Sequence, residues 1–265
     1  MPILLGLFFF ISGASIASFL CNLSTRLSKN EQVSRGRSHC DHCGKNLSWY
    51  ELIPIISYLF LRGRCHSCRK KIDVSYTLTE CILGILFALS GLVWHQSIYA
   101  TLPEPQAWLM LAFWLVNASL FTLISYHDYR HFLILDRFVA AGTILNLVLL
   151  ALLYQIQMLT YIAAGGLNAL FIGLIVLATK GKGMGEGDIK LAFLIGLVTG
   201  FPHNFTALFL GFVSGACIGV ILIISKKKTS KDIIPFGPFL SFGAVTTLLF
   251  GEQILAWYLR SFIIF

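Results

Sequence analysis

The sequence predicts an all-α polytopic membrane protein, with about eight transmembrane helices and a cytoplasmic zinc-binding loop between the first two. Three observations support this fold class. Of 265 residues, 57% are hydrophobic and only 12% are charged, and apolar runs of about 20 residues, long enough to cross a bilayer as helices, recur along the chain. Lys and Arg gather in alternate loops between these runs. Two Cys-x-x-Cys pairs follow the first run.

The first apolar run, Ile3 to Leu23, is expected to be a retained helix. It lacks the basic start of a signal peptide and exceeds the usual length of a signal peptide's apolar part. The other seven expected spans are residues 76–94, 107–126, 132–154, 160–179, 189–200, 205–225 and 235–257. The span 189–200 is short, so the sequence leaves open whether it joins 205–225 in one broken helix.

The positions of the basic residues predict the orientation of these spans. Residues 24–75 hold ten of the twenty Lys and Arg residues. Most of the others fall in 127–137, 180–190 and 226–232, whereas 95–106, 155–159 and 201–204 have none. Because short cytoplasmic loops carry the positive excess, the N-terminus is expected outside and the basic loops inside. The net charge of +8 is then explained by topology and lipid headgroups, without nucleic acid.

The long basic loop contains two pairs of cysteines, and these predict a metal site. Cys40 and Cys43 form the first pair, Cys65 and Cys68 form the second, and Gly44 follows the first pair. Four thiolates suit a closed, tetrahedral, structural zinc site, although the 21 residues between the pairs slightly exceed the usual separation. The alternatives are disulfide or redox use, which is rare in the reducing cytoplasm, and a loop without metal.

Two acidic residues lie at the edges of apolar spans, where an uncompensated carboxylate is costly. Asp128 follows one span, and Asp188 ends a Gly-x-Gly-Asp pattern that opens another on the same side of the membrane. Such residues are functional candidates, and two neighbouring carboxyl groups can share a proton in acid–base chemistry. Asp136 could equally be a helix-start charge. His127, next to Asp128, is expected at the membrane interface. Lys190, two residues after Asp188, is expected to snorkel to the interface or to pair with an acidic residue.

Several ordered motifs resemble the bacterial type IV prepilin peptidases, which are membrane aspartic proteases of the GxGD class. The matching residues are Ser18–Leu20, Arg26–Leu27, Arg37–Gly44, Trp49–Leu59, Arg62–Cys65, Cys68, Tyr76, Glu80, Gly185–Leu191 and Pro235–Leu240.

The resemblance implies that Asp128 and Asp188 are a catalytic pair that cleaves the basic leader of prepilins or pseudopilins at the cytoplasmic membrane face. It also implies S-adenosylmethionine-dependent N-methylation of the new N-terminus, an activity associated with the zinc loop, in a bacterial inner or plasma membrane. No residue is assigned to the methyl donor. The expected domains are a first transmembrane helix (1–23), the four-Cys loop (24–75) and a transmembrane peptidase domain (76–265).

Two other functions stay open at this point. One is a GxGD peptidase that acts on other membrane substrates. The other is a proton-coupled transporter, in which intramembrane acids relay protons. A transporter should show inverted repeats and acids near the bilayer midplane, whereas this sequence shows no clear repeat and places its acids at the interface.

Overall fold

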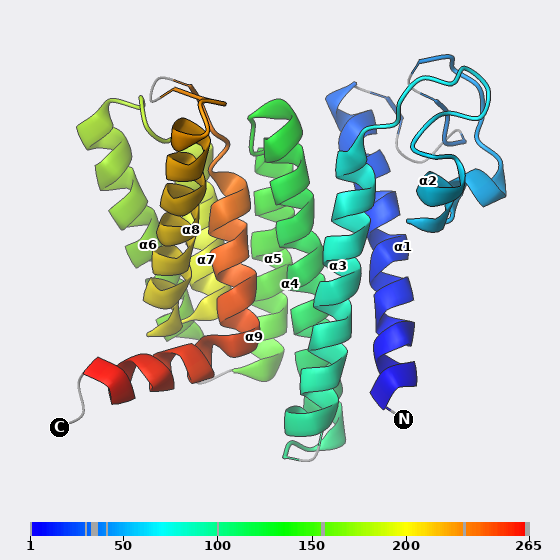
Figure 1. Cartoon of the computed structure of the whole chain (residues 1–265). Coiled ribbons are helices and arrows are strands. Elements are labelled where there is room, and N and C mark those ends of the chain that lie inside the picture. Colours follow the sequence, from blue (N-terminus) through cyan, green and yellow to red (C-terminus); the bar gives the residue numbers. More distant parts are fainter. Residues whose placement is uncertain are drawn as a thin grey trace. The chain divides into compact units, whose positions relative to one another are not determined.

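The computed structural model describes residues 2–29, 31–32, 37–40, 42–99, 101–154, 157–229 and 232–262. In these residues the regular elements are helices (Figure 1). They fall into two compact units, Met1–Leu102 and Pro103–Phe265. Seven of the described helices are long and apolar enough to cross a membrane. The chain is therefore a multi-pass, all-helical membrane protein, as predicted.

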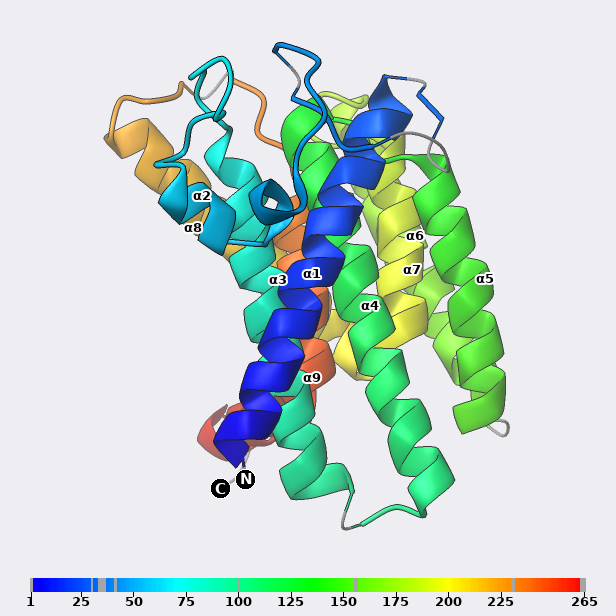
Figure 2. The same ribbon diagram turned by 90° about the vertical axis from the view of Figure 1, so that its right-hand side faces the viewer.

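The first unit is a helix pair with the Cys loop between its two members. Helix α1 (Pro2–Ser28) packs along α3 (Val74–Val93), which continues as the short π-helix η2 (Trp94–Ile98) (Figure 2). A Cβ atom on Gly13 of α1 would lie 2.6 Å from the Leu83 carbonyl oxygen of α3. Small residues thus let the two backbones approach closely, as is usual for helix pairs in membranes.

The loop of the first unit contains two short helices that the sequence did not predict. These are the 3₁₀-helix η1 (Trp49–Leu52) and the helix α2 (Ile56–Phe60). Both lie between the two cysteine pairs. The loop is therefore a folded element and not only a linker.

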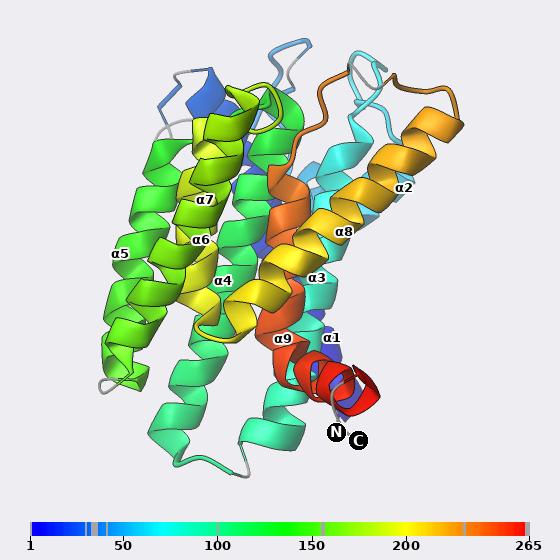
Figure 3. The ribbon, with the colours of Figure 1, turned by 90° about the vertical axis from the view of Figure 1, so that its left-hand side faces the viewer.

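In its described residues, the second unit contains six helices. They are α4 (Glu104–His131), α5 (Asp136–Leu153), α6 (Met158–Thr179), α7 (Glu186–Thr199), α8 (His203–Ile224) and α9 (Gly237–Phe262). Successive helices run in opposite directions, so the end of α4 and the starts of α7 and α9 lie at one end of this unit (Figure 3). That end carries both predicted aspartates.

Helix α7 is the centre of the second unit. Its 14 residues extend about 21 Å, less than the roughly 30 Å of the hydrocarbon core. It contacts α5, α6, α8 and α9, and Leu191, Leu194 and Ile195 are fully buried. Because protein surrounds the helix, its ends do not expose unpaired backbone groups to lipid.

Helices α7 and α8 are separate, which answers the question that the sequence left open. Gly200 follows α7 with φ +66°, a left-handed conformation that favours glycine. Helix α8 then begins at His203. The short connection reverses the chain, so the two apolar segments are two helices.

Buried asparagines join helices inside the second unit. The Asn117 and Asn146 side chains of α4 and α5 exchange two hydrogen bonds, of 2.8 and 3.0 Å. The Asn204 amide of α8 donates to the Asn168 side-chain oxygen of α6 at 2.9 Å. Interhelical hydrogen bonds in membrane proteins contribute about 0.6 kcal/mol each on average, so these pairs fix helix neighbours more than they stabilise the fold.

Candidate active site and metal centre

Asp128 lies on α4 itself, near its end, and not in the connection that follows. The apolar span was expected to stop at Tyr126, but the helix continues to His131, because polar residues can extend a helix beyond the hydrocarbon. The Asp128 side chain is buried, with 5% of the residue exposed. Its Oδ2 atom accepts a hydrogen bond of 2.9 Å from the backbone N–H of Gly237.

Gly237 is the first residue of α9, and its missing side chain makes room for Asp128. A Cβ atom at position 237 would lie 2.6 Å from Asp128 Oδ2, well inside van der Waals contact. The positive end of the α9 dipole also favours a carboxylate there. The sequence analysis quoted Pro235–Leu240 only as a matching motif. A glycine between Phe236 and Pro238 at a helix start was the signal for this role.

Asp188 is the third residue of α7 and caps the start of its own helix. Its Oδ2 atom accepts a hydrogen bond of 2.8 Å from the Gly185 N–H, and only 8% of the residue is exposed. The neighbouring Gly187 approaches Ile134 of the α4–α5 connection, where a Cβ atom would lie 3.0 Å from Ile134 Cβ. This contact joins the Gly-x-Gly-Asp turn to the chain that follows Asp128.

The structure brings Asp128 and Asp188 together at one end of the second unit. They are close enough for the charge of Asp188 to act on Asp128. Both lie at helix ends, near position 131 of α4 and position 186 of α7, and not at the middle of the helices. This placement favours a site at the membrane boundary over a proton path through the bilayer midplane.

Asp136 is outside this buried pair. It is the first residue of α5, is exposed, and accepts a hydrogen bond of 2.7 Å from the Lys190 Nζ atom of α7. Lys190 thus pairs with an acidic residue, one of its two expected positions. A role of Asp136 as a helix-start charge remains a prediction.

The histidine beside Asp128 is not at the surface, contrary to expectation. His127 is buried, and its ring packs against His131 and Phe138, with centroid distances of 4.6 and 5.6 Å. The helix turns this side chain toward α5 and not toward the interface. The His127 ring therefore forms part of the packing between α4 and α5, next to Asp128 in the sequence.

The four predicted zinc ligands form one cluster in the first unit. The Sγ atoms of Cys40, Cys43, Cys65 and Cys68 lie within 4.8 Å of one another, and those of Cys40 and Cys68 are 3.9 Å apart. Tetrahedral zinc with Zn–S bonds of about 2.3 Å requires S···S separations of about 3.8 Å. The donor set and its spacing therefore fit such a metal ion, and no disulfide joins these thiols.

Two turns of the same backbone pattern present the cysteines. In the first, Cys40 N–H donates to the Lys45 carbonyl and Gly44 N–H to the Cys40 carbonyl; in the second, Cys65 N–H donates to Lys70 and Arg69 N–H to Cys65. A β-bridge closes each turn. The residue after each pair has a positive φ, +70° at Gly44 and +59° at Arg69. Glycine was anticipated at the first turn, but the arginine in the second was not.

The turns also change the acidity of two thiols. Backbone N–H groups of Cys68 and Ser67 lower the pKa of Cys65 to about 7, because they stabilise the thiolate. Burial raises the pKa of Cys40 to about 11. A metal ion bound to both would hold both as thiolates.

Comparisons with known proteins match both units. Residues 11–95 match the Bacterial Peptidase A24 N-terminal domain, and residues 115–220 match the Type IV leader peptidase family. The first match includes the four cysteines, and the second includes Asp128 and Asp188. No solved structure matches the chain.

Curated relatives match most of the chain. The prepilin leader peptidase/N-methyltransferase of Bacillus subtilis is 31% identical over 95% of this chain and 96% of its own length. Proteins of the same name from Stutzerimonas stutzeri and Pseudomonas aeruginosa are 33% and 32% identical over 84% of this chain, covering 75% and 74% of their own lengths.

The fold and the two matched regions define a multi-pass membrane protein of the peptidase A24 class. The chain belongs to the type IV leader peptidase family.

Proposed function

We propose that this protein cleaves the basic leader from type IV prepilins or pseudopilins, with Asp128 and Asp188 as the catalytic pair. The observation that carries the proposal is the burial of these two carboxyl groups at one end of the second unit, within range of each other's charge, inside the region that matches the leader peptidase family. The names of the curated relatives support the substrate class.

Two buried carboxyl groups within range of each other's charge suit hydrolysis by a pair of acids, one acting as base and the other as acid. One carboxylate takes a proton from water as the water oxygen attacks the scissile carbonyl carbon. The other carboxyl group gives its proton to the amide nitrogen as the C–N bond breaks. The N–H groups of Gly237 and Gly185 each hold one carboxyl group in place. The two aspartates thus need no bound metal for this step.

The basic loops support a cytoplasmic active site in a bacterial inner or plasma membrane. Residues 127–137 and 180–190 flank the aspartates and carry Lys and Arg, which short cytoplasmic loops retain. A prepilin inserted in the same membrane would present its leader on that side.

The four cysteines would hold a structural Zn²⁺ ion, which would crosslink the two turns of the loop. The amine released by cleavage would be the acceptor for methylation from S-adenosylmethionine, as the names of the relatives suggest. We assign no residue to the methyl donor. The peptidase and methyl-transfer proposals can therefore fail separately.

Co-expression with a type IV prepilin, followed by mass measurement of the mature N-terminus, tests both proposals. We expect loss of the leader and a gain of one methyl group on the new N-terminal residue. An intact leader with all candidate prepilins would contradict the peptidase proposal. Cleavage without methylation would leave the peptidase and remove the second activity.

A further inference from the structure

An exposed apolar segment interrupts the polar Cys loop of the first unit. Residues 49–60, here called the interfacial segment, comprise η1, the connection and α2. Phe60 is 84% exposed, Trp49 75% and Leu59 67%, and Leu52 and Ile56 are exposed as well. So many large apolar side chains on one short segment mark an interaction surface and not a water-facing loop.

A hydrogen bond fixes the depth of this segment along α3. The Glu80 side chain of α3 is buried, and its Oε2 atom accepts a bond of 2.8 Å from the Ile55 N–H just before α2. Glu80 lies six residues after Val74, the first residue of α3, or about 9 Å along the helix. In Figures 1 and 2, α2 accordingly lies beside the helix pair and not beyond its end.

The length of the α3 span gives the depth of Glu80 in the membrane. The apolar span Val74–Ile98 has 25 residues and extends about 37 Å, whereas the hydrocarbon core is about 30 Å thick. A centred span leaves about 4 Å outside the core at each end. Glu80 and the Ile55 N–H therefore lie about 5 Å inside the edge of the hydrocarbon core, a depth at which interfacial elements bury their apolar faces.

The backbone holds α2 in this position from both ends. Ile55 has φ +63° and ψ −52°, and Ile56 N–H donates to the Pro54 carbonyl, a tight turn that a β-branched residue rarely adopts. At the other end Gly63 N–H donates to the Tyr58 carbonyl, two residues before Cys65. The interfacial segment is thus tied to α3 on one side and to the second cysteine turn on the other.

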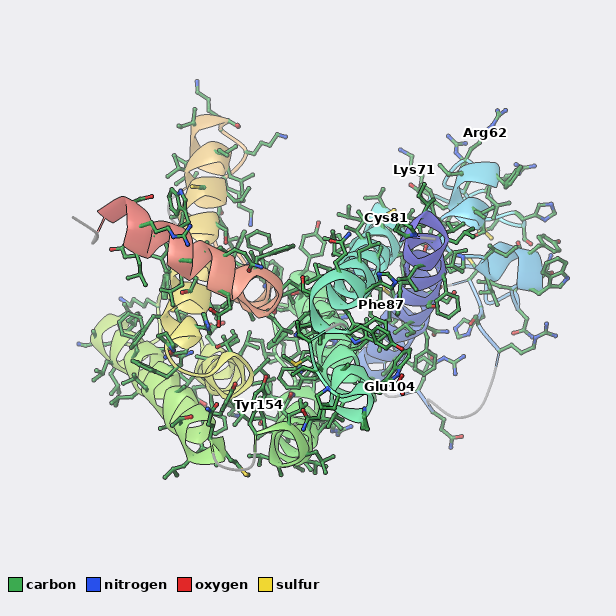
Figure 4. The ribbon with its side chains drawn as sticks, turned by 90° about the horizontal axis from the view of Figure 1, so that it is seen from below. Arg62, Lys71, Cys81, Phe87, Glu104 and Tyr154 are labelled. Carbon is green, nitrogen blue, oxygen red and sulfur yellow. The ribbon has the colours of Figure 1, made fainter. Side chains whose placement is uncertain are left out.

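Basic side chains follow the apolar ones directly. Arg62, Arg64, Arg69, Lys70 and Lys71 are all exposed. The side chains of Arg62 and Lys71 point outward from this unit (Figure 4). An apolar edge followed by a basic edge is the pattern of elements that lie in the interface of an anionic membrane.

We propose that the interfacial segment inserts its apolar edge among the acyl chains of the leaflet on the Cys-loop side, while the basic residues contact acidic headgroups. The loop between α1 and α3 would then be partly a membrane-interface element, and the lipid would hold the cysteine turns at the surface. The proposal depends on insertion of α1 and α3 in a bilayer and is independent of the peptidase activity.

Photocrosslinking of the whole chain in nanodiscs tests this inference. A benzophenone amino acid replaces Phe60 in discs that contain phosphatidylcholine and phosphatidylglycerol, and mass spectrometry identifies the adducts. The matched control replaces His66, an exposed residue of the second cysteine turn. We expect severalfold more phospholipid adduct at position 60 than at 66, and a lower yield at 60 for R62Q/R64Q or in discs without phosphatidylglycerol.

Other adducts would overturn the proposal. Crosslinks from position 60 to residues 103–265, or to a second copy of the chain, would show that protein and not lipid covers this edge. Equal lipid yields at 60 and 66 would show contact without insertion. Because the probe replaces one exposed aromatic residue with another, folding is expected to be unaffected, and retained zinc content checks this.

Discussion

The two units build their sites by opposite means. In the second unit the Asp128 carboxyl group is held by Gly237, which is 109 residues away in sequence, and the site exists only when α4, α7 and α9 pack. In the first unit each cysteine pair is presented by a turn of a few residues. The proposed peptidase site should therefore fail with small shifts in helix packing, whereas the proposed metal site should respond to local changes in its turns.

The largest expected effect comes from replacing each proposed catalytic carboxyl group with an amide of the same size, which cannot exchange a proton. We expect D128N and D188N each to reduce leader cleavage by at least about 10³-fold, because general acid–base catalysis is lost. The double variant should be hardly slower than either single one, since the residues act as a unit. Initial rates on a purified prepilin measure this.

Asp136 provides the matched control for these variants. It is an exposed acid beside the same helices, and D136N should retain substantial cleavage if it is only a helix-start charge. Strong cleavage by D128N or D188N would show that the catalytic pair is placed wrongly.

The next test disturbs the packing around the site and leaves both acids in place. In G237A the new methyl group would collide with Asp128 Oδ2, so the carboxyl group or α9 must move. Displacements of about 1 Å at a catalytic centre cost about 10²-fold in rate. The control is G219A in α8, where a Cβ atom meets no other atom within 4 Å. Equal rates for the two variants would contradict the assigned role of Gly237.

Loss of a proposed metal ligand should affect the first unit and largely spare the second. C40S should lower zinc content and the protease resistance of the loop, and should reduce methylation more than cleavage. Exposed Cys217 on α8 gives the control C217S. Brief chelation should likewise leave hydrolysis intact, because in the proposed mechanism carboxyl groups activate the water. Full zinc content in a C40S/C65S double variant would refute the ligand assignment.

Among the described residues, apolar periodicity predicted α1 and α3 to α9 and missed α2, and it marked membrane boundaries and not helix ends. It stopped α4 at Tyr126 and began α7 at Ile189, so it left Asp128 and Asp188 just outside helices that in fact contain them. The cysteine cluster was predictable because its ligands recur in a local pattern. The Gly237–Asp128 and Glu80–Ile55 hydrogen bonds join residues 109 and 25 positions apart, and single-sequence reasoning has no means to pair such positions.

The smallest expected effect concerns the two cysteine turns, which share a backbone but differ at one residue. Gly44 and Arg69 both have positive φ, a conformation that costs a residue with a side chain about 1–2 kcal/mol. R69G should therefore strengthen zinc retention and G44A should weaken it, each by about 1 kcal/mol. Position 44 has no neighbouring atom within 4 Å of a Cβ, so the backbone alone sets the cost there. R69A removes the charge but keeps the Cβ atom, and it should behave like the unmodified chain. The rate of zinc transfer to a chromogenic chelator measures all three variants. If R69A retained zinc as strongly as R69G, charge and not backbone conformation would explain the difference between the turns.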